Sequence, residues 1–217
     1  ERPESLREAM RYSLLAGGKR LRPILCLAAC ELAGGDAEHA MPTAVALEMI
    51  HTMSLIHDDL PAMDDDDLRR GKLTLHKQYD EATAILAGDA LLPLAFEVLG
   101  HPETHPNANV RIELVNALAR ASGANGMVGG QMIDLQAEHE TFNIGQITRL
   151  QRLKTGELIA YACEAGAILG QASEKSQEAL RGYAHNLGLA FQIADDLLDV
   201  EGSVEEAVSY THLTLPT

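Results

Sequence analysis

Apolar residues recur at intervals of three and four along almost the whole chain of 217 residues, and this helical periodicity limits the possible folds more than any other feature. Aromatic residues make up only 4% of the sequence and tryptophan is absent. Strands favour β-branched and aromatic residues, so the composition also favours helix. No sustained strand alternation is visible. The periodicity predicts helices over Leu6–Leu15, Leu21–Leu32, Met41–Leu60, Ala82–Leu99, Val110–Ala121, Ile144–Leu169 and Gln177–Val200.

Glycine and proline mark the breaks between these segments. Gly17 and Gly18 are typical of a helix end, and Pro42 is typical of a first helical turn. The segment Gly100–Asn109 is the clearest loop, and Gly123–Gly130 predicts a helix break or a tight junction. The breaks are short, so consecutive helices are expected to pack against one another.

The chain is expected to form one all-α domain, because no long linker or low-complexity tract divides it. We assign this domain to residues 1–207 and interpret it as shortened at both ends. The last ten residues, Val208–Thr217, lack helical periodicity and follow a strongly helical run. We interpret them as an unrelated extension and leave them out of the fold prediction.

Several classes of protein are excluded by composition. The formal net charge is −15, whereas a nucleic-acid binder needs a basic stripe. No run of about 18 uninterrupted apolar residues is present, so no membrane span is predicted. The N-terminus shows no signal-peptide pattern, and three cysteines do not make a disulfide framework. We therefore expect a cytoplasmic protein.

Six aspartates crowd into ten residues at the end of an apolar segment: Asp58, Asp59 and Asp64–Asp67. Crowded carboxylates repel one another unless a cation or protons intervene. An exposed acidic loop would be the simplest explanation, but the preceding run LEMIHTMSLIH is apolar, so Asp58 and Asp59 end a buried helix. Pro61 bends or ends that helix, which allows Asp64 to return towards Asp58.

A second polar cluster lies near the other end of the chain. Its members follow one another at i, i+3, i+4 and i+7: Gln192, Asp195, Asp196 and Asp199. Asp195 and Asp199 would lie about 40° apart around the helix axis and about 6 Å apart along it. Apolar core residues normally occupy this spacing. A polar stripe on an otherwise apolar helix must line a polar cavity or bind a cation.

The chemistry of these two clusters predicts Mg²⁺ as the cofactor. Their ligands are all oxygens, with no cysteine nearby, which favours Mg²⁺ over zinc. Mg²⁺ completes its coordination with water and substrate phosphates, so the acidic site predicts an anionic, diphosphate-like substrate. Two short basic clusters supply complementary charge. They are Lys19, Arg20, Arg22 and Arg69, Arg70, Lys72.

Six motifs, in order, resemble the trans-polyprenyl diphosphate synthase family, most of all its bacterial short-chain farnesyl and geranylgeranyl diphosphate synthases. They are GGKRLRP (17–23), HTMSLIHDDLPAMDDDDLRRG (51–71), AGDALL (87–92), GGQMIDL (129–135), KTGELI (154–159) and FQIADDLLDV (191–200). The resemblance spans roughly Leu6 to Glu206. It implies an antiparallel helical bundle around a deep central cavity, the isoprenoid synthase-like fold, usually in a homodimer.

The resemblance also implies substrates and the residues that bind them. Three Mg²⁺ ions, for which Mn²⁺ can substitute, would be held on an allylic diphosphate by Asp58, Asp59, Asp64, Asp195 and Asp199. The same diphosphate would be gripped by Arg69 and Lys154. The diphosphate of isopentenyl diphosphate would be bound by Lys19, Arg22, His51 and Arg70. Gln131 would support the metal shell.

For the chemistry itself, the family pattern implies that Thr155 and Gln192 direct dipoles towards an allylic carbocation. The allylic substrates would be dimethylallyl and geranyl diphosphate, and the product farnesyl diphosphate, with geranylgeranyl diphosphate as the alternative. Met53 and Ser54 stand where side-chain bulk would limit product length. Catalysis would depend on Asp58, Asp59, Lys154, Thr155, Gln192 and Asp195.

Other classes of function remain open at this point. A terpene cyclase shares the first aspartate motif, although its second motif usually differs and it lacks a second diphosphate site. His57 and Asp58 also form the pair with which metal-dependent HD phosphohydrolases begin. A catalytically inactive helical subunit would carry the same motifs. His51, taken alone, would be interpreted as a core histidine.

The sequence departs from the family in one respect. Members carry a lysine after the second aspartate motif and then further closing helices, whereas no Lys or Arg follows Arg181 here. We therefore expect this chain alone to condense substrates poorly. The family function is expected for the parent protein.

Overall fold

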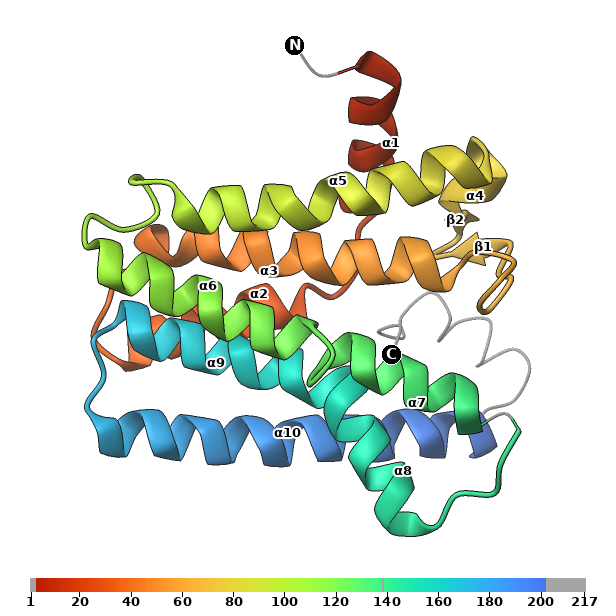
Figure 1. The fold of residues 1–217 in the computed structure, drawn as a ribbon. Helices are drawn as coiled ribbons and strands as arrows, with labels where there is room; N and C mark the ends of the chain where they lie inside the picture. The colour runs from red at the N-terminus through yellow and green to blue at the C-terminus, as the bar shows by residue number, and fades with distance from the viewer. Residues whose placement is uncertain (1–2, 138, 202–217) are drawn as a thin grey trace.

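A computed structural model describes residues 3–137 and 139–201 (Figure 1). These residues are almost entirely helical, which confirms the predicted all-α class. The elements are α1 (Glu4–Leu14), α2 (Leu21–Leu32), α3 (Ala37–Asp58), β1 (Leu68–Arg69), β2 (Lys72–Leu73), α4 (Leu75–Gln78), α5 (Glu81–Gly100), α6 (Ala108–Ser122), α7 (Met127–Ala137), α8 (Ile144–Gln151), η1 (Arg152–Gly156), α9 (Glu157–Leu169) and α10 (Glu174–Glu201). Residues 208–217 lie outside the described part, so their interpretation stays a prediction.

Helix α3 is the central element of the bundle. It packs mainly against α5 and α2, and also touches α9, α1 and α6, while α9 in turn packs against α2, α6 and α10 (Figure 1). From Thr43 to Ile56 nearly every α3 side chain is buried, on all faces of the helix. The helix ends at Asp58, so the first acidic cluster begins where the most enclosed helix of the bundle stops.

The ends of α3 are set by local interactions. Asp36 caps the helix by accepting a hydrogen bond from the backbone N–H of Glu38 at 2.9 Å. The helix therefore begins earlier than predicted, and Pro42 lies inside it rather than in its first turn. After Asp58 the chain reverses, and the N–H of Asp64 donates to the carbonyl oxygen of Asp58 at 2.9 Å. The predicted return of Asp64 is confirmed.

The segment predicted as one helix over Ile144–Leu169 is divided by a π-helical turn. The five residues of η1 separate α8 from α9. A π turn inserts extra residues into the helical register, and such turns are frequent at functional sites. Helix α7 was also missed, because it begins inside the predicted break and contains Gly129 and Gly130. Both regions of difference lie beside the cavity described below.

The short hairpin β1–β2 was not predicted from sequence. Leu68 pairs with Leu73, and Arg69 pairs with Lys72, in antiparallel register. The two connecting residues, Arg70 and Gly71, have φ angles of 54° and 73°. Two consecutive positive φ angles are typical of the type I′ turn that matches the twist of a hairpin. Strands of two residues are too short to show an alternating pattern.

Helix α5 is long and apolar enough to cross a membrane by length and composition, and it is the only such helix among the described residues. It lies along α3 and also contacts α1, α4 and α6. Its inward face is completely buried at Ala84, Leu91 and Leu99. This packing accounts for the apolar residues on the inward face of α5, whereas Ile85, Leu86 and Leu92 are exposed.

Helices α2 and α9 approach closely because of one glycine. A Cβ atom on Gly166 of α9 would lie 2.4 Å from the carbonyl oxygen of Cys26 and 2.7 Å from the Cβ of Ala29, both on α2. Gly182 on α10, by contrast, has open space where a Cβ would stand. The two positions form a matched pair for testing this packing.

We predict that Gly166→Ala destabilises the protein by about 1–3 kcal/mol, because the added methyl group meets rigid backbone and must separate the two helices. Gly182→Ala should leave stability unchanged or raise it by up to about 1 kcal/mol, since alanine is the better helix former. Urea unfolding followed by circular dichroism measures both. Equal midpoints for Gly166→Ala and the wild type would contradict the close packing.

Candidate functional site

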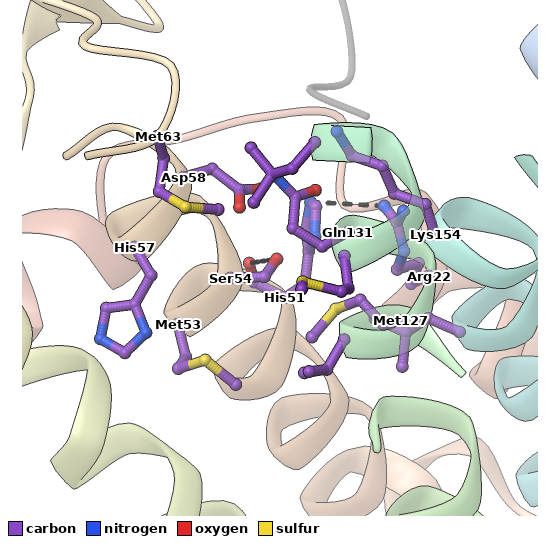
Figure 2. A pocket seen from close by; sticks show the side chains of 14 residues that line it. Arg22, His51, Met53, Ser54, His57, Asp58, Met63, Met127, Gln131 and Lys154 are labelled. Carbon is purple, nitrogen blue, oxygen red and sulfur yellow. Dashed lines mark hydrogen bonds between the residues drawn. The ribbon is translucent and has the colours of Figure 1, made fainter. Parts of the chain in front are cut away.

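A cavity of about 340 Å³ opens between α3, α7, η1 and the start of α9. Its polar lining residues are Arg22, His51, Ser54, His57, Asp58, Gln131 and Lys154, and its apolar ones are Met53, Met63, Met127, Val128, Met132, Leu135 and Leu158. Figure 2 shows Asp58, Gln131, Lys154 and Arg22 towards one end, with Met53 and Met127 further down. The cavity thus has a charged end and a methionine-rich wall.

The carboxylates at the end of α3 are buried. Asp58 is 8% exposed and Asp59 is 4% exposed. Loss of hydration raises the pKa of Asp58 to about 7 and that of Asp59 to about 6, despite nearby Lys154 and Arg69. Asp64 is exposed by comparison, and the partial loss of hydration at its carboxylate also raises its pKa. Buried carboxylates of this kind gain from a cation that restores their ionised form, so the residues present suit a divalent metal.

Asp59 differs from its neighbours because it already has a strong protein partner. The Nε of Arg69 donates to its Oδ1 at 2.5 Å, and the Nη2 of Arg69 reaches Asp66 at 3.2 Å. Asp58 and Asp64 instead share the nearby charge of Lys154. Of the three predicted ligands in this cluster, Asp58 and Asp64 are therefore the ones left more available to an added cation.

For the second acidic cluster, the structure describes the helix but not the carboxylate side chains. Asp195 and Asp199 lie on α10, as predicted, but their side chains are outside the described set. Among the side chains that are described, no three His, Cys, Asp or Glu groups converge on one metal position. The predicted approach of the two clusters therefore stays a prediction.

Lys154 reaches the cavity from the π-helical turn. Its Nζ donates to Oδ2 of Asp134, on α7, at 2.5 Å. A Cβ on Gly130 would lie 2.2 Å from the backbone nitrogen of Lys154, so α7 rests directly on the turn. The sequence prediction omitted Asp134, although it follows Gln131 at i+3 within the motif GGQMIDL, and that spacing on one helix face was the available signal.

Arg22 and His51 form the buried part of the basic region. Arg22 is 3% exposed, and its Nη1 lies 3.3 Å from Nε2 of His51. Burial lowers the pKa of Arg22 to about 10 and, with the surrounding arginines, lowers the pKa of His51 well below its ordinary value. His51 is therefore neutral, and its Nε2 accepts from Arg22, because a guanidinium only donates.

Several buried polar atoms near the cavity have no hydrogen-bond partner within the described protein. They include Nε of Arg22, Nε of Arg70 and both side-chain polar atoms of Gln131. A buried polar group without a partner costs free energy that a bound ligand can recover. These atoms are therefore free to bond to a ligand.

Arg70 joins the hairpin to the glycine loop that precedes α2. Its Nη1 donates to the carbonyl oxygen of Gly17. A Cβ on Gly18 would lie 2.5 Å from the Cζ of Arg70, so the guanidinium rests on that glycine. Lys19, next in the chain, is exposed. The structure thus brings the two predicted basic clusters together although about 50 residues separate them.

Thr155 and Gln192 are also brought together, from η1 and α10. The Oγ1 of Thr155 donates to Oε1 of Gln192 at 3.4 Å, and both residues are buried. They lie behind the cavity wall formed by Lys154 and Leu158 rather than on it. Met53 and Ser54, predicted to limit product length, do line the cavity.

His57 does not take part with Asp58 in a paired metal site. Its Nε2 lies 3.2 Å from the carbonyl oxygen of Ile85 and 3.9 Å from a carboxylate oxygen of Asp89, both on α5. A Cβ on Gly88 would lie 2.2 Å from that same nitrogen. The imidazole therefore packs into α5, and this geometry removes the support for an HD phosphohydrolase.

The arrangement agrees with what comparison with known proteins shows. Residues 3–208 match the model of the polyprenyl synthetase family. This chain belongs to the polyprenyl synthetase family. The resemblance seen in the motifs is thereby confirmed. A crystal structure from Zymomonas mobilis, described as an apo FPP/GFPP synthase, has a TM-score of 0.90 and 52% sequence identity, covering 97% of this chain and 81% of that one.

Curated relatives of this polyprenyl synthetase carry two kinds of name. Farnesyl diphosphate synthase of Micrococcus luteus is 54% identical over 200 residues, or 92% of this chain and 68% of the relative. Geranylgeranyl diphosphate synthase of Cyanophora paradoxa is 51% identical over 94% of this chain and 68% of its own length. The chain spans between 59% and 70% of the lengths of the first four relatives.

The raised pKa of Asp58 predicts how the stability of the metal-free protein depends on pH. Between its ordinary value of 3.8 and about 7, the folded protein holds a proton that the unfolded chain has lost. Stability in the presence of a chelator should therefore fall as pH rises from about 4 to about 7. Asp58→Asn should flatten that fall, because the amide does not ionise.

Urea unfolding at several pH values, with and without Mg²⁺, measures this effect. Mg²⁺ should stabilise the wild type at pH 8 more than Asp58→Asn. Asp67→Asn is the matched control, since Asp67 is an exposed member of the same cluster whose pKa Lys77 lowers. Identical pH slopes for the wild type and Asp58→Asn would contradict the assignment of a raised pKa to Asp58.

Proposed function

We propose that this polyprenyl synthetase is a Mg²⁺-dependent short-chain prenyltransferase. It condenses isopentenyl diphosphate with dimethylallyl and then geranyl diphosphate to give farnesyl diphosphate. The observation that carries the proposal is the two-part cavity, with Asp58, Lys154, Arg22 and Gln131 at one end and a methionine-rich wall beyond. Such a cavity suits a ligand that has an anionic head and a hydrocarbon tail.

The charged end provides two places for a diphosphate. One lies beside Asp58, Asp64 and Lys154, where carboxylates and a cation are mixed. The other lies beside Arg22, His51 and Arg70, where buried donors without partners predominate. Two different diphosphates are what a condensation needs, whereas a terpene cyclase needs one. The second place therefore supports a prenyltransferase over a cyclase.

The residues at the charged end of the cavity would promote breakage of the allylic C–O bond. When bound, Mg²⁺ would neutralise the departing diphosphate and assist breakage of the allylic C–O bond. Asp58 and Asp64, with Asp195 and Asp199, would hold it, and Mn²⁺ could take its place. Lys154 donates hydrogen bonds to the leaving diphosphate, which stabilises the charge that develops there.

The rest of the site protects and directs the carbocation. Apolar side chains such as Met53, Met127 and Leu158 exclude water from the tail region of the cavity. The hydrogen-bonded pair of Thr155 and Gln192 directs its dipoles from behind the wall. Arg22, His51 and Arg70 hold the second diphosphate so that the isopentenyl double bond faces the cation. The released diphosphate accepts the final proton.

The second candidate product is geranylgeranyl diphosphate, because relatives of about equal identity carry either name. A catalytically inactive subunit is disfavoured by the buried, unpartnered polar atoms of Arg22, Arg70 and Gln131, which suit a bound ligand.

We further propose a cytoplasmic homodimer with no nucleic-acid partner. Support for these points is the family resemblance and the net charge of −15.

In the complete parent protein, we predict that Asp58→Ala and Asp195→Ala each lower turnover on the order of 100-fold or more, because both remove charge that faces the diphosphate through a cation. Circular dichroism should show unchanged helicity. Asp65→Asn, in the same acidic loop but exposed, is the control and should retain activity. Condensation of labelled geranyl diphosphate with isopentenyl diphosphate is the assay. Full turnover in excess EDTA would refute the metal requirement.

Product length should respond to the volume of residue 53. Met53 lines the cavity next to Ser54, which is one turn before Asp58 on α3, and methionine is unbranched and can fold aside. In the complete parent protein, Met53→Tyr should therefore shift the products shorter, and Met53→Ala should shift them longer. Chromatography of the dephosphorylated alcohols measures the distribution. If both variants give the same products as the wild type, the residue that limits product length lies elsewhere on the cavity wall.

A further inference from the structure

Arg20 has an unusual backbone conformation in the loop that binds the second diphosphate. It occupies the left-handed region with φ 52° and ψ 33°, directly before α2 begins at Leu21. This conformation is unfavourable for residues other than glycine, so something must hold it in place. Lys19 and Arg22, the predicted ligands of isopentenyl diphosphate, stand on either side of Arg20. Their directions therefore depend on this one strained residue.

Two contacts of the Arg20 side chain hold the strained backbone. Its Nη2 donates to the carbonyl oxygen of Leu14, at the end of α1, at 2.7 Å. Its Nη1 donates to Oε1 of Glu48, on α3. The Arg20 side chain is 28% exposed and the Glu48 side chain only 8%. The guanidinium thus ties the loop to two helices that flank it, and one of these ties is a largely buried ion pair.

Glu48 lies close to the whole basic region. It is one turn before His51 on α3. Burial lowers the pKa of both Arg22 and Arg70, and the negative charge of Glu48 opposes part of that fall. Neither the metal chemistry nor the proposed substrate contacts use Glu48. It does not line the substrate cavity, and its side of the helix faces a small depression beside Leu14, Leu15 and Pro23.

We propose that the Arg20–Glu48 ion pair is a positioning device for the second diphosphate site. It holds the loop Gly17–Arg22 in the shape that directs Lys19 and Arg22 towards isopentenyl diphosphate, although neither Arg20 nor Glu48 touches that substrate. The inference rests on the proposed function for the identity of the ligand. Both residues thereby set the affinity for isopentenyl diphosphate and leave the allylic site unchanged.

A different role for Glu48 makes the opposite prediction. If it served only as a counter-charge for the arginines, its removal would strengthen binding of an anion through simple Coulomb attraction. If the ion pair only stabilised the fold, its removal would lower the melting temperature and affect both substrates alike. A positioning role weakens the binding of one substrate and spares the other.

The experiment compares Glu48→Gln and Arg20→Gln with the wild type, all three in the complete parent protein. Calorimetry measures binding of isopentenyl diphosphate, and steady-state kinetics measure KM for isopentenyl and geranyl diphosphate separately. Release of one strained residue should raise the dissociation constant and KM for isopentenyl diphosphate about tenfold. The KM for geranyl diphosphate and kcat at saturation should stay within about twofold. Glu38→Gln, an exposed carboxylate on the same helix, is the matched control and should change neither constant.

Arg20→Gly separates the backbone from the charge. Glycine adopts the left-handed conformation without cost but makes no ion pair. If the ion pair acts by holding the backbone, Arg20→Gly should bind isopentenyl diphosphate more tightly than Arg20→Gln, within about threefold of the wild type. If Arg20→Gln unfolds in part, the comparison of Arg20→Gly with the wild type still tests the inference.

The outcomes divide clearly. Unchanged or tighter binding of isopentenyl diphosphate by Glu48→Gln overturns the inference, and so does an equal loss for both substrates. Binding of isopentenyl diphosphate by the complete parent protein without any condensation product overturns the proposed function, while the inference is still decided by the dissociation constants. A wild-type protein that binds no isopentenyl diphosphate at all overturns both.

Discussion

The burial of charge within an apolar bundle is the constraint on which this structure depends. Asp58 and Asp59 are buried at the C-terminal end of α3 and Glu48 is buried near its middle, and each ionised group loses much of its hydration there. Partners from elsewhere in the chain offset that loss, among them Arg69 from the hairpin and Arg20 from the glycine loop. Ion pairs, as well as apolar packing, therefore hold segments that are far apart in sequence against α3.

The sequence predicted the long helices well because their period repeats many times. Leu21–Leu32 was predicted to the residue, and α5, α6 and α10 differ from prediction by a few residues at each end. The return of Asp64 towards Asp58 was also predictable, since Pro61 removes the hydrogen bond that would continue α3. Motif order also pointed to Arg22, Asp58 and Lys154, which the structure brings to one cavity.

The remaining features could not be predicted because tertiary contacts decide them. The π-helical turn has the composition of an ordinary helix, and the close contact of the Gly130 backbone with Lys154 is visible only in the structure. The pairing of Asp59 with Arg69, and of Lys154 with Asp134, selects one partner from several of equal charge. Such choices depend on distances that sequence spacing does not contain.

The hairpin turn has a consequence for communication between the two halves of the site. Arg69 and Arg70 are adjacent in sequence, yet one is fixed to Asp59 and the other to the carbonyl oxygen of Gly17. A single peptide bond joins the backbones of the two arginines, inside a hairpin whose turn has a defined handedness. A ligand that shifts this backbone when it draws one guanidinium away also changes the free energy of the other contact. By thermodynamic linkage such an effect is reciprocal, so the affinities for two anions would then depend on each other.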